Sequence, residues 1–201
     1  MKFHEIVTLR YATKKFDGQI IPEEKIDQLL ELIRLSASSV NLLPWKVKIV
    51  KDQATKELLL PASYNQAQIT TCSHLLIFCA ETKLHEKNKK LEKIMHQENI
   101  PEEQIKGFTG MIDGLLNSMS DKDMLIWAQK QTYIALGNAI NGAKALGFDS
   151  CPMEGFNPVE YSRILKLPEH LVPTVICPIG YAATNDVKQN KVRFSREEQF
   201  F

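Results

Sequence analysis

Apolar positions recur at helical spacing along much of the chain. Between Pro22 and Ala37 the apolar side chains fall every three or four residues, which predicts an amphipathic helix. Pro22 suits its start, because the missing N–H of proline costs nothing in the first turn. Comparable spacing predicts further helices over residues 3–9, 83–97, 101–119 and 121–146, with another opening at Asn157 and Pro158.

Three segments instead have the pattern of β-strands. Residues 45–50 alternate apolar and basic side chains, as a half-exposed strand does, whereas residues 75–79 are continuously apolar, as in a buried strand. Residues 172–181 form the last apolar strand, and residues 38–44 are a loop. The helices outnumber the strands, and the strands are not adjacent in sequence. We therefore expect an α+β fold of three layers around a mixed or antiparallel sheet.

Composition narrows the class of protein. The 201 residues are 44% hydrophobic and 24% charged, close to the globular average, which fits one domain over residues 1–201. A formal net charge of +1 argues against a nucleic-acid or anionic-membrane partner. With no bilayer-spanning apolar run and no signal-peptide core, we expect a cytoplasmic protein. The four scattered cysteines are expected to be reduced core thiols, with no metal bound: Cys72, Cys79, Cys151 and Cys177.

Motif searches exclude several familiar chemistries. Residues 137–144 lack the Gly-Lys-Ser/Thr of a phosphate loop and lie inside a helical pattern, where the glycines favour close helix packing. No G-x-G-x-x-G follows a strand, and neither G-x-S-x-G nor H-E-x-x-H occurs. The five histidines are dispersed, so no catalytic dyad is indicated.

Four short segments remain as candidates for function. They are the turn with Arg10 and Lys14, the polar loop 38–41, the Gly-containing turn 152–156, and the cations Lys191 and Arg193. Taken singly, each has an ordinary structural explanation, since surface cations are usually solvated and polar loop residues usually satisfy their own turn.

Taken together and in order, these segments resemble the oxygen-insensitive nitroreductase family of NAD(P)H-dependent FMN oxidoreductases, which includes dihydropteridine-reductase-like and flavin-reductase members. The resemblance covers nearly the whole chain. The matching segments are RYATKKF (10–16) to R-x-S-x-[RK]-x-[FY], SASSVNLLPW (36–45) to A-P-S-S-x-N-x-Q-P-W, the strand SHLLIFCA (73–80), LGFDSCPMEGF (146–156) to L-G-x-D-x-x-P-[IM]-E-G-F, and Lys191-x-Arg193 to K-x-R.

The resemblance implies a three-layer fold with a mostly antiparallel sheet wrapped by helices. It also implies an intertwined homodimer that binds FMN at its interface, with NAD(P)H as co-substrate. The small-residue helix from Met124 to Leu146 is the candidate for the centre of the dimer. Flavin N5 would carry the chemistry, so no side chain is assigned as catalytic.

The family pattern also implies individual roles. Arg10, Lys191 and Arg193 would bind the FMN phosphate, and Lys14 would lie at the N1/C2-carbonyl edge of the flavin. Asn65 would bond the pyrimidine edge, residues 38–41 would come from the partner subunit, and a backbone donor at residues 154–155 would point at N5. The complete cofactor set is Arg10, Tyr11, Ala12, Lys14, Ser38, Ser39, Asn41, Leu43, Asn65, Pro152, Met153, Glu154, Gly155, Lys191 and Arg193.

Three residues depart from the family pattern: Leu43 stands in place of Gln, Ala12 in place of Ser, and Gln68 in place of Lys. They leave the redox potential, the choice between NADH and NADPH, and the acceptor open. Residues 107–119 would form a lid over the flavin. The candidate substrate contacts are Gln68, Phe108, Leu115 and Leu116.

The expected activity is ping-pong hydride transfer from NAD(P)H through the flavin to a nitroaromatic, quinone, flavin or pteridine. Two alternatives stay open. The same scaffold could carry out a specialised dehydrogenation or dehalogenation, or the chain could be an FMN-binding protein whose reductase activity is vestigial.

Overall fold

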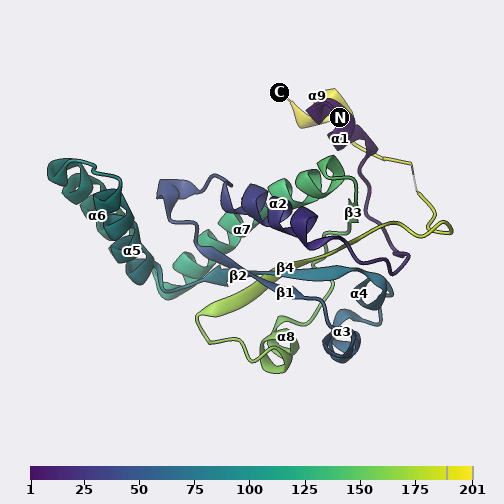
Figure 1. The fold of residues 1–201 in the computed structure, drawn as a ribbon. Coiled ribbons are helices and arrows are strands. Elements are labelled where there is room, and N and C mark those ends of the chain that lie inside the picture. Colours follow the sequence, from purple (N-terminus) through teal and green to yellow (C-terminus); the bar gives the residue numbers. More distant parts are fainter. Residues whose placement is uncertain (189, 201) are drawn as a thin grey trace.

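A four-stranded antiparallel sheet with strand order β1-β2-β4-β3 organises the computed structural model (Figure 1). It describes residues 1–188 and 190–200; Gln189 and Phe201, which belong to the predicted domain, lie outside the described residues. The strands are β1 (Trp45–Val50), β2 (His74–Glu81), β3 (Asp149–Ser150) and β4 (Leu171–Gly180). The helices are α1 (Phe3–Leu9), α2 (Glu23–Arg34), η1 (Ser39–Asn41), α3 (Gln53–Leu59), η2 (Pro61–Ser63), α4 (Gln68–Thr71), α5 (Leu84–Gln97), α6 (Glu102–Asn117), α7 (Asp121–Ala145), α8 (Pro158–Ile164) and α9 (Arg196–Gln199).

Helices cover both faces of this sheet. Figure 1 shows α2 and α7 on one face and α3, α4 and α8 on the other. The central strand β2 is buried along its whole length, and its side chains alternate between the two layers. Leu76 and Phe78 pack with α2 and α7, whereas Leu75 and Ile77 pack with the helices on the opposite face. The predicted three-layer α+β fold with an antiparallel sheet is confirmed.

Helix α7 is the longest helix, at 25 residues, and packs across the sheet beside α2. Its N-cap is Ser120, whose hydroxyl accepts a hydrogen bond from the Asp123 N–H, so the predicted caps Asp121 and Asp123 are wrong by one and three residues. Within residues 1–188 and 190–200, no helix has both the length and the apolar character needed to cross a bilayer.

Helices α5 and α6 form an arm that extends beyond one end of the sheet, opposite the two termini (Figure 1). A small separate core holds its base, in which Leu42 of the loop after α2 meets Leu84, Ile112 and Leu116. Inside the arm, the buried Asn88 donates a hydrogen bond of 2.9 Å from Nδ2 to the Thr109 carbonyl. The arm is therefore tied to the body mainly through its base.

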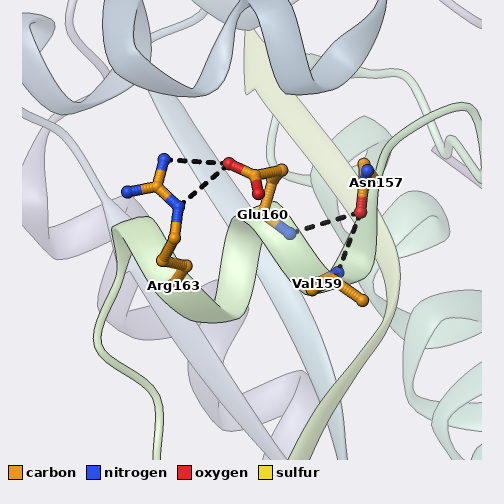
Figure 2. A network of polar contacts seen from close by, with 4 residues as sticks. All are labelled: Asn157, Val159, Glu160 and Arg163. Carbon is orange, nitrogen blue, oxygen red and sulfur yellow. Dashed lines mark hydrogen bonds and ion pairs between the residues drawn. The ribbon is translucent and has the colours of Figure 1, made fainter.

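Most long elements follow the predicted pattern, and α8 begins as expected at Asn157 and Pro158. The Asn157 side chain accepts from the Val159 and Glu160 N–H groups at 3.0 and 3.2 Å, which caps the helix (Figure 2). The prediction missed six short elements, namely η1, α3, η2, α4, β3 and α9.

A first prediction concerns His74, which is buried at the start of β2 and bonded through Nδ1 to Ser73. Burial lowers its pKa, and Lys51 and Lys56 add to this effect against the opposing Glu23. The unfolded chain therefore binds a proton more strongly, so stability is complete above the ordinary histidine pKa of about 6.5 and declines as the pH falls below it.

Urea unfolding at pH 7.5 and pH 5.5 measures this effect. The midpoint of the parent should fall at pH 5.5, and His74→Gln should lose much of that dependence. His85→Gln, at an exposed position, is the control and should keep it. An equal pH dependence in His74→Gln and the parent would contradict the assignment.

A second prediction compares two helical glycines. Gly110 lies exposed in α6 with open space where a Cβ would stand, whereas a Cβ at the buried Gly142 would lie 3.1 Å from the buried Leu29 and 2.9 Å from Leu32. Gly110→Ala should raise the free energy of unfolding by about 0.5–1 kcal/mol through helix propensity. Gly142→Ala should fall short of that gain because the ends of the Leu29 and Leu32 side chains must shift to make room. Equal gains in urea melts would refute this difference.

Candidate functional site

The N-terminal segment after α1 lies along the edge of the sheet beside β3. Ala12 pairs with Ser150 in a parallel bridge, and the Thr13 N–H donates to the Ser150 carbonyl at 3.2 Å. Phe16, which is buried, pairs with Ala182 after β4. These backbone contacts fix the turn that carries Arg10 and Lys14.

The C-terminal segment pairs with the same turn from the other side. The Asp17 N–H donates to the Tyr181 carbonyl at 2.9 Å, and the Ala183 N–H donates to the Lys15 carbonyl at 3.0 Å. Two segments more than 160 residues apart in sequence thus run together beyond the end of β4.

Further contacts continue this pairing along the tail. Asp186 Oδ1 accepts from the backbone N–H groups of Lys14 and Lys15 at 3.2 and 3.1 Å. Lys191 Nζ donates to the Val7 carbonyl of α1 at 2.5 Å. The predicted cations of the two ends are therefore brought together.

These cations line one cavity of about 510 Å³. Its lining residues are Thr8, Arg10, Tyr11, Lys188, Asn190, Lys191 and Arg193. Lys188 Nζ lies 5.7 Å from the centre of the Tyr11 ring. Desolvation lowers the pKa of Lys191, and the positive charges of Arg10, Arg193 and Lys188 lower it further.

The cations of this cavity have no carboxylate partner among the described residues. Within residues 1–188 and 190–200, Arg10, Lys188, Lys191 and Arg193 form no ion pair. Unpaired cations that converge on a hollow repel one another until an anion binds, and guanidinium groups match phosphate oxygens well. The cavity is therefore suited to a phosphate dianion.

Lys14 lies outside the cavity lining, at the surface above Cys151. Its Nζ is 3.7 Å from the Cys151 sulfur. Burial raises the pKa of the Cys151 thiol even though Lys14 and Arg10 act in the opposite direction. Lys14 thus places a positive charge directly before the turn 152–156.

That turn is held from two sides. Gln66 Nε2 donates to the Gly155 carbonyl at 2.9 Å, and a Cβ on Gly155 would lie 3.1 Å from that nitrogen. On the other side, the Tyr133 hydroxyl of α7 donates to Glu154 Oε1 at 2.5 Å, and burial with this contact raises the pKa of Tyr133 to about 12. The Gly155 N–H makes no hydrogen bond to any described residue, so it remains a donor for a ligand.

The loop with Ser38, Ser39 and Asn41 does not line the cavity of its own chain. It leads into the base of the α5–α6 arm, far from the termini (Figure 1). Ser38 Oγ accepts from the Leu43 N–H at 2.9 Å, and the Ser39 N–H donates to Gln131 of α7 at 2.9 Å. These bonds leave the exposed Asn41 side chain free within the described chain.

Asn65 and Leu43 both have a positive φ angle, but only the Asn65 side chain is exposed. Asn65 has a φ of +56° and an exposed side chain with no described partner, so it can bind a ligand. Leu43 has a φ of +45°, but its side chain packs against the core beneath α7, which leaves little of it for a cofactor.

Three of the predicted contact residues have buried side chains in this structure. Gln68 is 4% exposed, and its Nε2 bonds to Gln66 Oε1 and the Met153 sulfur. Leu116 is fully buried at the base of the arm, and Met153 is 6% exposed within the core under β4. As placed, Gln68 and Leu116 offer no surface to a substrate, whereas Phe108 and Leu115 remain partly exposed.

Sequence reasoning missed Lys188 and Asp186. Lys188 precedes Lys191 by three residues, and counting cations along the tail would have found it. Asp186 carries no local signal, because its partners lie 171 and 172 residues away.

Comparison with known proteins identifies the family of this chain. The model of the Nitroreductase family matches residues 7–181. A Staphylococcus haemolyticus protein, provisionally named an NAD(P)H nitroreductase, is 34% identical over 94% of this chain and 91% of its own. Two crystal structures have the same fold: a provisional nitroreductase of Bacillus subtilis (TM-score 0.92, 22% identity, 98% and 96% of the two chains) and one of Exiguobacterium sibiricum in complex with FMN (TM-score 0.89, 21% identity, 99% and 96%). The chain belongs to the nitroreductase family.

Proposed function

We propose that the chain is an FMN-dependent NAD(P)H oxidoreductase, with residues 1–201 as one FMN-binding domain. The observation that carries this proposal is the cavity in which Arg10, Lys188, Lys191 and Arg193 converge, with no carboxylate partner in the part of the chain that the structure describes. The names of the relatives and the FMN complex of one neighbour support the same cofactor and reductant.

The residues present fit FMN. The phosphate carries a charge of about −2 and needs several fixed cations, which the cavity supplies. Beyond the cavity, Lys14, the free Gly155 N–H and the exposed Asn65 amide provide a cation, a donor and a polar edge for the flavin ring. When bound, FMN would accept hydride from NAD(P)H and pass electrons to an acceptor.

The remaining roles belong to this chain's own residues. Lys14 would stabilise negative charge at the N1/C2-carbonyl edge and so raise the reduction potential. Gly155 N–H would bond N5, held in place by Gln66 and the Tyr133–Glu154 pair. Protons can come from solvent, so no general acid is required.

We place FMN at the interface of a homodimer. The loop 38–41 lies away from its own cavity, so its polar groups would serve the partner's site. Helix α7 also exposes Ile126, Tyr133 and Ile134, apolar surface that a second copy would cover. NAD(P)H and the acceptor would then use the same open flavin face in turn, in a ping-pong reaction that suits nitroaromatics, quinones, flavins or pteridines. A cytoplasmic location fits these substrates.

A third prediction tests the phosphate cavity. Arg193→Ala should weaken FMN binding about tenfold or more with little change in fold stability, because the exposed side chain makes no packing contact that the fold needs. Quenching of FMN fluorescence measures the Kd. Arg163→Ala is the matched control, because Arg163 is an exposed arginine paired with Glu160 outside the cavity (Figure 2). A Kd for Arg193→Ala equal to that of the control would remove Arg193 from the site.

A fourth prediction tests the activity. The FMN-loaded protein should lose its absorbance near about 450 nm within seconds of adding NADH or NADPH without oxygen, and an acceptor should restore it. A bound flavin that neither nucleotide reduces would favour an FMN-binding protein with vestigial activity. Rapid reduction without turnover of nitrofurans, quinones, pteridines or FMN would favour a specialised dehydrogenase or dehalogenase. A protein that cannot be loaded with FMN would refute every version.

A further inference from the structure

The carboxylate of Asp186 joins the two segments that carry the cations. Its Oδ1 accepts from two consecutive backbone N–H groups, those of Lys14 and Lys15. The Asp186 N–H in turn donates to the Ala183 carbonyl at 2.9 Å, and the Ala183 N–H donates to the Lys15 carbonyl. Asp186 therefore closes a compact set of bonds between the turn after α1 and the tail after β4.

The negative charge of this carboxylate is unfavourable for the proposed binding of a phosphate. A negative charge near a phosphate site opposes the binding of a dianion. Asp186 offsets none of the positive charge by direct pairing, because no described cation lies within ion-pair distance of it. Its Oδ2 is buried and has no hydrogen-bond partner in the described part of the chain. A role as a bridge between backbones accounts for the two bonds that it does make.

The tail needs such a bridge. Beyond Asp186, Lys188, Lys191 and Arg193 are exposed and repel Arg10, and the tail's contact with α1 is the bond from Lys191 to Val7. Without Asp186, the repulsion would move the tail cations away from Arg10 and would release the turn that positions Lys14.

We propose that Asp186 is a positioning residue for the cofactor, which sets the tail cations against Arg10 and holds Lys14 at the flavin edge. The inference rests on the proposed FMN function. It assigns to a single side chain the coupling between the phosphate end of the site and the ring end.

Two substitutions separate position from charge. Asp186→Asn keeps an oxygen that can accept from Lys14 and Lys15 but removes the negative charge, whereas Asp186→Ala removes both. If Asp186 acted only through its charge, both variants would bind FMN more tightly. If it positions the backbone, Asp186→Ala weakens binding and Asp186→Asn does not.

The experiment measures the FMN Kd by fluorescence quenching for the full-length parent and variants. Asp186→Ala should bind about tenfold more weakly, and Asp186→Asn should stay within about twofold of the parent or bind more tightly. Asp52→Ala is the matched control, because Asp52 also accepts a backbone bond, from the Thr55 N–H at 2.8 Å, but at the start of α3. It should lose stability without losing FMN affinity.

The reduction potential of bound FMN gives a second readout that general loosening of the fold would not produce. Asp186→Ala should lower the potential, as Lys14→Met does, and adding it to Lys14→Met should cause no further decrease. Asp186→Ser, whose hydroxyl is too short to reach both N–H groups, replaces the alanine variant if that variant does not fold, with the same expectations.

Parental affinity in Asp186→Ala, or equal weakening in Asp186→Ala and Asp186→Asn, would overturn the inference and leave the proposed function intact. An additive decrease in potential in the Lys14→Met background would also overturn it. A parent protein that binds no FMN would overturn both.

Discussion

The pairing of the two chain ends beside β3 and β4 is the constraint on which the candidate site depends. It holds four like charges around one cavity, although two unit charges 4 Å apart in water repel by about 1 kcal/mol. The repulsion is tolerated because the backbone bonds of Thr13, Asp17 and Ala183 fix the segments at the edge of the sheet. Because the fold holds these cations together against their repulsion, binding a dianion in the cavity would stabilise it more than binding a neutral ligand.

The edge of the sheet can hold these mutually repelling cations because its centre is tightly packed. Strand β2 is buried on both faces, and it pairs with β4 from His74 to Glu81 and with β1 from Leu75 to Ala80. The short β3 then extends the sheet to the point where the N-terminal turn attaches. Phe16 closes this corner: a Cβ at Gly180 would lie 2.8 Å from its ring. The cation site thus begins where the packed core ends.

Local sequence patterns predicted the elements that are determined by the pattern of buried side chains within one segment. The apolar run of β2 and the helical spacing of α2 and α7 are visible in the sequence because burial alone determines them. Strand β3, at two residues, exists only because β4 offers it a partner, and the Asp186 bridge depends on a turn about 170 residues away. The convergence of Arg10 with Lys191 and Arg193 was inferred from family motifs, since nothing in their local sequence brings them together.

Different interactions hold the two ends of the proposed site. The departures from the family pattern lie between these ends. The phosphate end relies on charge carried by exposed, long side chains, whereas the turn at Gly155 is fixed by hydrogen bonds from Gln66 and Tyr133. Gln68 stands where the family pattern has a lysine, and its amide is buried and bonded to Gln66. The side chain that would have carried charge toward the ring instead supports the residue that holds the turn. In the proposed site, Lys14 would then supply the positive charge at the ring end, and its placement by the backbone would matter more than in a chain with the family's lysine at position 68.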